Sequence, residues 1–269
     1  MEKLDSTLNK YRSLKTLLSI EDERELLYNY VYSTNKLEGN QLTLAQTSQL
    51  LSTDTITGSN VRTKDILEQK GMYRALVRML KAVRDKEQLS ASLLLEFNWL
   101  SIGQLWKYED SYIGAKGEGQ KEGFFKVSQN MISISQGGKT IQRLVPLSTP
   151  DNVVENVNKL LTSILGSNKS VITKAAFLAQ ELWLHQPFVD GNKRAGRLAI
   201  NFLTMKEGFP LFVFEDKSRN YNSLLVEQYL DKKPGLIEDY IEKALIKTMN
   251  RALDIEKNKG KDMGFRMML

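Results

Sequence analysis

Apolar residues that recur every three or four positions constrain this 269-residue chain more than any other feature of its sequence. This spacing places them on one face of an α-helix, where they can pack against a core. The pattern predicts helices that start near Leu4, Leu26, Thr63, Ser90, Asn152, Thr173, Asn192, Tyr221 and Pro234. Thr173 is expected to cap its helix, and the last helix is expected to end near Met249. We therefore predict an all-α fold.

The segment from Lys107 to Pro150 breaks this pattern. Glycines punctuate it, while Ile132, Ile134 and Ile141 follow the period of two that is typical of strands. These features predict a long loop and then a hairpin that turns near Gln136, Gly137 and Gly138. The expected architecture is one helical domain with a small β-hairpin.

Composition excludes several classes of protein. A chain with no Cys has neither disulfides nor thiolate chemistry, and its single His cannot supply a His-based zinc site without several carboxylate or water ligands. No apolar stretch approaches the ~20 residues that span a bilayer, and the amino terminus lacks an apolar signal core. We expect no membrane segment, no export and a cytoplasmic location.

The net charge of +6 is spread along the chain. Its concentrated part, Lys257 to Lys261, is typical of a solvated tail. Nucleic acid is therefore not expected as a partner, and the sequence leaves the oligomeric state open, a homo-oligomer included.

One stretch of 13 residues, from His185 to Arg197, combines the only His, an acid, a turn and three bases. A Gly-Asn pair that leads into a helix presents unpaired backbone N–H groups and the positive end of the helix dipole, which bind anions. Asp190 offers a hard oxygen ligand for Mg²⁺, and Arg194 and Arg197 lie three apart, on one face of the helix. The stretch predicts a phosphate site.

Each part also has a structural interpretation. An Asp-Gly pair commonly forms a turn, helical arginines commonly form surface ion pairs, and Phe188 is expected in the core. Other phosphate motifs are absent, since the chain has no Walker sequence, and the glycines from Gly117 to Gly123 lack the preceding apolar strand of a dinucleotide fold. The coincidence of the parts therefore carries the prediction.

Three segments of the sequence resemble those of a known family. The residues from Pro187 to Arg197 resemble the Fic (Fido) signature, His-Pro-Phe-x-(Asp/Glu)-Gly-Asn-(Gly/Lys)-Arg-x-x-Arg. Residues 123–147 resemble the family's target-binding hairpin, or flap, and residues 34–40 resemble its inhibitory motif, Ser/Thr-x-x-x-Glu-Gly/Asn. The resemblance covers roughly residues 20–245 and implies a Fic-type helical bundle.

The resemblance also implies an activity, the transfer of AMP from ATP to a Ser, Thr or Tyr hydroxyl of a target protein or of the chain itself. The target would dock on the 131–147 hairpin. The domain division that follows is an amino-terminal helical segment with the inhibitory motif (1–60), a Fic-like nucleotide-binding core (61–250) and a basic tail (251–269).

The family's roles map onto individual residues. By resemblance, Asp190 binds Mg²⁺, Gly191 and Asn192 cradle the α- and β-phosphates, and Arg197 reaches the γ-phosphate. Lys193 and Arg194 complete the phosphate site, and Tyr221 lines the pocket for the nucleotide base. Thr34 and Glu38 belong to the inhibitory motif, in which Glu38 is expected to pair with Arg197 and restrain the site.

The catalytic base departs from the family pattern. The family places a His directly before the Pro, whereas this chain has Gln186 there and His185 one position earlier. Glutamine cannot take a proton at neutral pH, and His can. In one interpretation Gln186 is an insertion and His185 acts as the base. In the other the register is kept, and a shift of one residue, ~3.5 Å along the chain, leaves His185 too far to act.

Three functions follow from these features. The first is a Fic-type protein adenylyltransferase that uses ATP and Mg²⁺ and is autoinhibited through Glu38. The second is a catalytically impaired member that binds a nucleotide as a regulatory or interaction protein. The third, a DNA-binding regulator, has less support, because too few residues follow Met249 for a winged-helix module.

Overall fold

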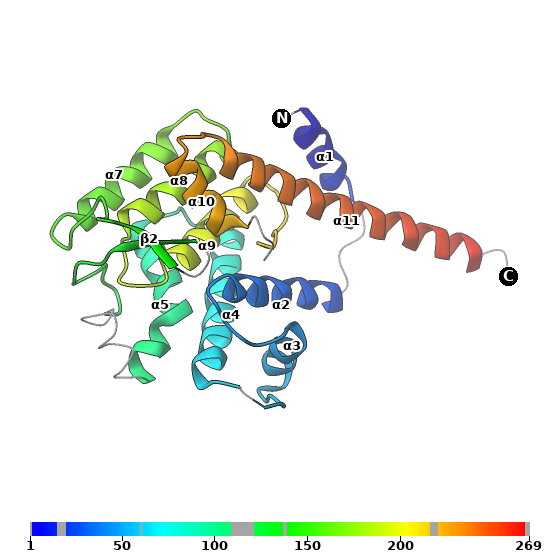
Figure 1. Ribbon diagram of the computed structural model, residues 1–269. Helices are drawn as coiled ribbons and strands as arrows, with labels where there is room; N and C mark the ends of the chain where they lie inside the picture. The colour runs from blue at the N-terminus through cyan, green and yellow to red at the C-terminus, as the bar shows by residue number, and fades with distance from the viewer. Residues whose placement is uncertain are drawn as a thin grey trace.

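The computed structural model describes residues 2–14, 20–59, 61–108, 121–136, 139–215 and 220–266. Over these residues the chain is mainly helical (Figure 1). The helices are α1 (Glu2–Arg12), α2 (Ile20–Lys36), α3 (Leu44–Thr53), α4 (Thr63–Arg84), α5 (Ala91–Tyr108), α7 (Val153–Gly166), α8 (Val171–His185), α9 (Asn192–Lys206), α10 (Tyr221–Leu230) and α11 (Leu236–Arg266). The predicted all-α class is confirmed.

Helix α9 lies at the centre of the bundle. It packs against α4, α5 and α8, and nearly all of its side chains are buried, including the charged Arg194 and Arg197. One hydrophobic cluster extends from Leu4 in α1 to Met249 in α11, so residues 1–60 contribute to the same core as residues 61–250. Two guanidinium groups inside such a core are costly unless each has a partner, so both arginines need acceptors within the core.

Two helix ends differ from the sequence prediction. Helix α8 is capped by Ser170, whose hydroxyl accepts the backbone N–H of Thr173 at 3.1 Å, so Thr173 is not the cap. Both residues have a hydroxyl, and periodicity alone does not distinguish them. Helix α11 continues past Met249 to Arg266, and Figure 1 shows its end projecting beyond the body of the molecule. None of the described helices is both long and apolar enough to cross a membrane.

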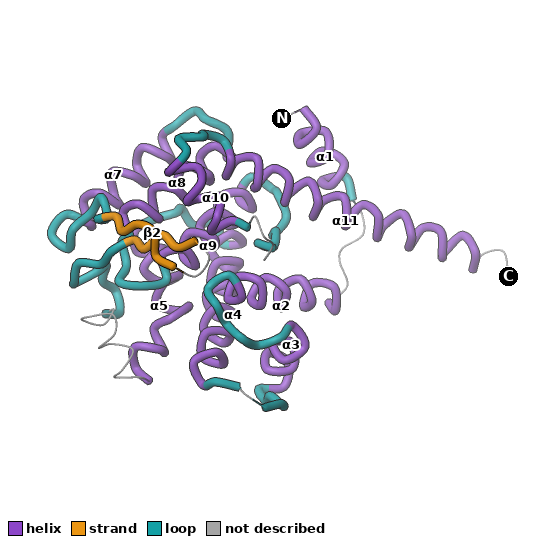
Figure 2. Tube along the Cα trace, in the orientation of Figure 1, coloured by secondary structure: helices purple, strands orange, loops and turns teal. Residues whose placement is uncertain are grey.

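The predicted hairpin is present as β1 (Ile132–Gln136) paired antiparallel with β2 (Lys139–Leu144), shown in orange in Figure 2. The turn at Gly137 and Gly138 lies outside the described residues. Ile132 and Ile134 are buried, whereas Ile141 is 56% exposed. The three isoleucines therefore do not share one face, because β1 turns its apolar side chains to the core and Ile141 on β2 faces solvent.

Candidate functional site

The loop between α8 and α9 contains the signature residues. Helix α8 ends at His185, and Gln186 follows in the left-handed region with φ of 45°. A residue other than glycine pays roughly 1–2 kcal/mol for this conformation. The side chain of Gln186 provides compensating bonds, since its amide donates to the carbonyl of Trp183 at 2.7 Å and accepts from Asn192 Nδ2 at 2.8 Å.

Asn192 fixes the shape of this loop. Its Oδ1 accepts the backbone N–H of Phe188 at 2.8 Å, and its Nδ2 also donates to the Phe188 carbonyl at 2.8 Å. Phe188 is fully buried and its ring lies 5.5 Å from that of Phe125, between ring centroids. The side chain of Asn192 thus serves the loop, and its backbone is at the start of α9.

The amino-terminal end of α9 fits an anion. Gly191 is the N-cap residue of α9 and takes a φ of 78°. It has no side chain that could accept a hydrogen bond from the first turn of the helix. A Cβ on this glycine would lie 2.7 Å from Asn98 Nδ2 and 2.9 Å from Ile102 Cδ1, so both conformation and packing require glycine. The first N–H groups of the helix and its dipole together favour a negatively charged group here.

Asp190 is held in place by this turn. Its carboxylate accepts the backbone N–H of Gly191 at 2.7 Å, and its carbonyl accepts from Asn98 Nδ2 at 2.8 Å. Within the part of the chain that the structure describes, no group of three His, Asp or Glu side chains is placed to hold a metal. Mg²⁺ at Asp190 would therefore need oxygen ligands from a bound phosphate or water.

Glu38 brings a carboxylate to this end of α9 from the loop after α2. Its Oε1 lies 2.9 Å from Arg197 and its Oε2 lies 2.9 Å from Lys193. The expected partner Arg197 is thus present, and Lys193 is a second one that sequence reasoning did not pair with Glu38. One carboxylate bridges two cations beside the helix terminus that favours anions.

These cations act on the ionisation of Glu38. Burial would raise its pKa, but Lys193, Arg197 and Arg194 together lower the pKa from 4.5 to about 2. The carboxylate therefore stays charged throughout the physiological range, and mild acidification does not break the contact.

The lowered pKa predicts a stability that depends on pH. A carboxylate with a lower pKa in the folded state contributes stability above its unfolded pKa, and this contribution is lost as pH falls through 4.5 toward 2. We expect the free energy of unfolding of the wild type, relative to Glu38→Gln, to fall by about 2 kcal/mol between pH 6 and pH 3. Urea unfolding across this range measures it, with Glu25→Gln as a control on an exposed carboxylate. A difference that is independent of pH would contradict the prediction.

Arg197 is fully buried, and its guanidinium has three neighbours besides the Glu38 carboxylate. It donates to the Thr34 carbonyl at 3.1 Å and to Asn222 Oδ1 at 3.2 Å, and it lies 5.9 Å from the centre of the Tyr221 ring. Asn222 also donates to Glu38 Oε1 at 3.3 Å. The sequence did not predict a role for Asn222. Its position next to Tyr221 was the only feature that pointed to the site.

Tyr221 and Arg194 are placed differently from expectation. Tyr221 is 1% exposed and packs on Phe214 and Tyr240, so it supports the guanidinium of Arg197 and does not line an open surface for a base. Arg194 is also buried, and its guanidinium lies 2.9 Å from Glu68 Oε1. Its contribution to phosphate binding stays a prediction, because the contact seen here is with a carboxylate of α4.

His185 is engaged away from α9. Its Nδ1 lies 2.6 Å from the Ser148 hydroxyl, and its Nε2 lies 3.5 Å from Glu181 Oε2. Gln186, in contrast, contacts Asn192 directly. The geometry thus favours the interpretation in which the register is kept and Gln186 holds the family's position, and it does not favour the inserted residue.

Lys126 fastens the base of the flap to this loop. It is 2% exposed, and its ammonium donates to the carbonyls of Ser148 and His185 at 2.5 and 3.3 Å. Its backbone N–H donates to the Pro187 carbonyl at 2.8 Å. Burial lowers the pKa of Lys126 to about 8. The resemblance to the flap included this lysine and gave it no role.

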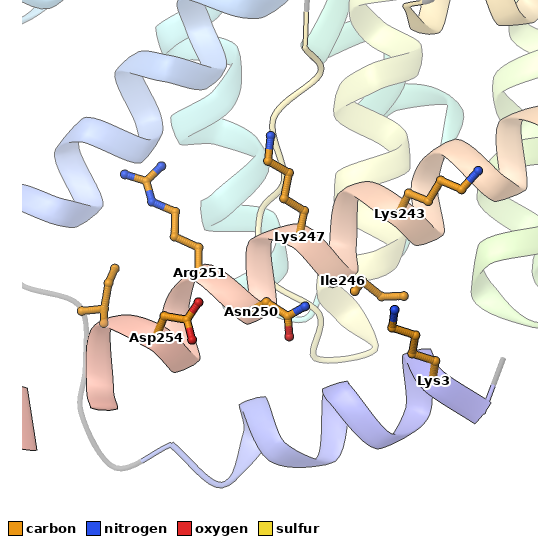
Figure 3. Close-up of a pocket in the computed structure, with 8 residues that line it drawn as sticks. Lys3, Lys243, Ile246, Lys247, Asn250, Arg251 and Asp254 are labelled. Atoms are coloured by element: carbon orange, nitrogen blue, oxygen red, sulfur yellow. The ribbon is translucent and has the colours of Figure 1, made fainter. Parts of the chain in front are cut away.

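Two hollows lie away from the signature loop. One, of about 700 Å³, lies between α1 and α11, and Figure 3 shows Lys3 of α1 extending toward α11. Of its cations, Lys247 pairs with Glu215 and Arg251 lies 3.8 Å from Glu25. The other, of about 600 Å³, is lined by residues of α1, α2 and α11 and of the loop after α9. Neither is lined by residues 185–197, so volume alone does not mark the site.

Protein adenylyltransferases of other organisms resemble this chain in sequence. Protein adenylyltransferase fic-1 of Caenorhabditis elegans is 29% identical over 220 residues, which cover 78% of this chain and 38% of that protein. Protein adenylyltransferase Fic of Drosophila ananassae is 26% identical over 230 residues, which cover 83% of this chain and 42% of that protein. The chain therefore spans about two fifths of the length of these relatives.

Solved structures share the fold. A Fic domain containing signalling protein from Bacteroides thetaiotaomicron matches with a TM-score of 0.78 at 23% identity, over 95% of this chain and 97% of that one. Fic-1 from Caenorhabditis elegans matches with a TM-score of 0.69 at 20% identity, over 94% of this chain and 70% of that one. The predicted Fic-type bundle with a small hairpin is confirmed.

The model of the Fic/DOC family matches residues 88–204. The match does not include residues 34–40, so the inhibitory role of Glu38 stays a prediction. The matched residues contain the whole signature loop and nearly all of α9, on which the site is built, so this part of the chain is similar to the Fic/DOC family.

Proposed function

We propose that this chain binds ATP at the amino-terminal end of α9 and transfers AMP to a protein hydroxyl under restraint by Glu38. The observation that carries the proposal is the carboxylate of Glu38, which bridges Lys193 and Arg197 beside the helix terminus at Gly191, whose N-cap residue has no side chain. Two cations converge there on an internal anion. A phosphate is the external anion that suits the same groups.

Each of these groups would contact a different part of the nucleotide. The backbone of Gly191 and Asn192 would receive the α- and β-phosphates, while Arg197 and Lys193, once free of Glu38, would receive the γ-phosphate. Mg²⁺, held by Asp190, would neutralise phosphate charge. Adenylyltransferase relatives support ATP as the nucleotide of this site.

The transfer would break one bond and form one. The oxygen of a Ser, Thr or Tyr hydroxyl would attack the α-phosphorus and displace pyrophosphate, and the hydroxyl proton would leave to a base or to water. His185 could take this proton only by turning away from Ser148, since its Nδ1 is engaged there at 2.6 Å. We therefore expect slow transfer in the wild type.

The hairpin is the proposed docking site of the target protein. Strand β2 lies at an edge of the two-stranded sheet, and exposed apolar side chains occur on it, at Ile141, and after its end, at Val145 and Leu147. An extended segment can add to such an edge through backbone hydrogen bonds. The exposed apolar side chains would then contact the side chains of the target.

A second function is supported by one observation. Gln186 holds the family's position of the base and is bonded to Asn192, so the chain would lack a proton acceptor at the reacting phosphate while it keeps the anion site. Such a protein would bind the nucleotide and act as a regulatory or interaction protein. The two functions are distinguished by measuring whether label from α-³²P-ATP enters protein, with and without Glu38.

Binding of the nucleotide can be tested apart from transfer. In a Glu38→Gly background, we expect Arg197→Lys to weaken the binding of a non-hydrolysable ATP analogue with Mg²⁺ by at least about tenfold, because lysine keeps the charge and loses the two-point fork. Calorimetry measures the affinity, and Arg251→Lys on exposed α11 is the matched control. Equal affinity in both variants, or no binding in the background itself, would contradict the phosphate site.

A further inference from the structure

The loop that carries Glu38 is fastened to α4 by the side chain of Asn40. Asn40 is 1% exposed and its amide group makes four hydrogen bonds. Its Nδ2 donates to the Asp65 carbonyl at 3.0 Å and to Glu68 Oε2 at 2.9 Å. Its Oδ1 accepts from Gln69 Nε2 and from the backbone of Leu42, each at 3.1 Å. A primary amide has no further capacity, so the position of this loop is strongly specified.

Glu68 connects the same loop to α9. It is 3% exposed, and its two carboxylate oxygens have different partners, Arg194 on α9 and Asn40 on the loop. Arg194 lies one turn before Arg197, which receives Glu38. The contacts therefore form a closed circuit. Glu38 contacts Arg197 on α9, Arg194 on the same helix contacts Glu68, and Glu68 contacts Asn40, which lies two residues after Glu38 in the chain.

The burial of this circuit makes it sensitive to single changes. A buried polar group that loses its partner costs about 1–3 kcal/mol, and more when it is charged. Glu68 is charged, and it would lose the Asn40 amide as a partner if the loop moved away from α4, while it keeps Arg194. Movement of Glu38 away from α9 is thus opposed at two places, the ion pairs of Glu38 itself and the Asn40 to Glu68 contact.

We propose that Asn40 and Glu68 form a latch that positions Glu38 against Arg197 and Lys193, so that restraint of the site depends on a contact outside it. The proposal rests on the proposed function for its effect on transfer, whereas the positioning itself concerns only this chain. Neither residue of the latch contacts Arg197 or Lys193, although Glu68 pairs with Arg194. Both act through Glu38.

An exchange of donor and acceptor tests the latch. Asn40→Asp replaces the donor by an oxygen that faces the Glu68 carboxylate, and we expect transfer to rise about tenfold. In Asn40→Asp with Glu68→Gln, the glutamine amide can donate to the new carboxylate while its oxygen accepts from Arg194. We expect this double variant to transfer at least threefold more slowly than Asn40→Asp. Asn250→Asp, on the exposed side of α11, is the control for the charge.

Two further measurements separate the latch from other effects. In a Glu38→Gly background, Asn40→Asp should add no further rise in transfer, and an equal rise there would overturn the proposal. Amide hydrogen exchange of residues 37–43 should quicken at least tenfold in Asn40→Asp and slow again in the double variant, with the wild-type fold shown by thermal unfolding. Unchanged exchange would also overturn it.

The exchange measurement does not depend on enzymatic activity. If Glu38→Gly neither bound ATP nor transferred label, the proposed function would fail while the exchange result still decided the latch. If Glu38→Gly raised transfer and Asn40→Asp did not, the latch would fail alone.

Discussion

Replacement of Glu38 by glycine is expected to raise the transfer of label from α-³²P-ATP to protein by tenfold or more. In the wild type, the Glu38 carboxylate lies 2.9 Å from both Arg197 and Lys193. In the proposed site, a γ-phosphate would have to displace this carboxylate to reach the same cations, so productive binding of ATP would break two ion pairs. Each tenfold gain corresponds to about 1.4 kcal/mol at the barrier, which is modest for the removal of such a competitor.

Matched variants identify the origin of the gain. Glu38→Gln keeps the length of the side chain and removes its charge, so it should activate less than glycine if part of the restraint is steric. Glu38→Arg should also activate, though its own cation will lie near Arg197 and Lys193. Glu25→Gln removes an exposed carboxylate that lies 3.8 Å from Arg251 and should leave transfer unchanged. Unchanged transfer in a Glu38→Gly protein that binds ATP would remove the inhibitory role.

The helices and the signature loop were predictable because their information is local. A period of three to four residues identifies a helix from one segment, and residues 185–197 carry their turn, acid and bases together. The starts of α4 and α10 were predicted at the observed residues. The sequence did not predict which of two similar residues caps a helix, as with Ser170 and Thr173 at the start of α8.

The partners of the site could not be read from the sequence. Glu68 and Arg194 are separated by 126 residues, and Asn222 and Glu38 by 184. No pattern marks a buried carboxylate or amide as the partner of a particular guanidinium, since the pairing depends on how α4, α9 and α10 pack. Tyr221 shows the same limit, because its place in the sequence suggested a pocket and packing directs its ring to Arg197.

Conversion of Gln186 to histidine is expected to raise transfer by about 100-fold or more in a Glu38→Gly background, since a placed general base contributes about 10²–10⁴. Gln186 already lies at the site, with its side chain bonded to Asn192 at 2.8 Å. Its backbone has a φ of 45°, in a region that histidine occupies more readily than most residues. An imidazole there can accept a proton, which an amide cannot.

His185 provides the contrasting variant. Because its ring is engaged by Ser148 and lies near Glu181, we expect His185→Ala to change the transfer rate by less than about threefold, in the same background. Ser148→Ala frees Nδ1 of the imidazole without removing it, and should have as little effect. The outcome that would instead assign the base to His185 is loss of transfer in His185→Ala together with no gain in Gln186→His. The ring would then have to turn from Ser148 toward α9 when the nucleotide binds, and Ser148→Ala, by removing the bond that opposes this turn, should raise the rate.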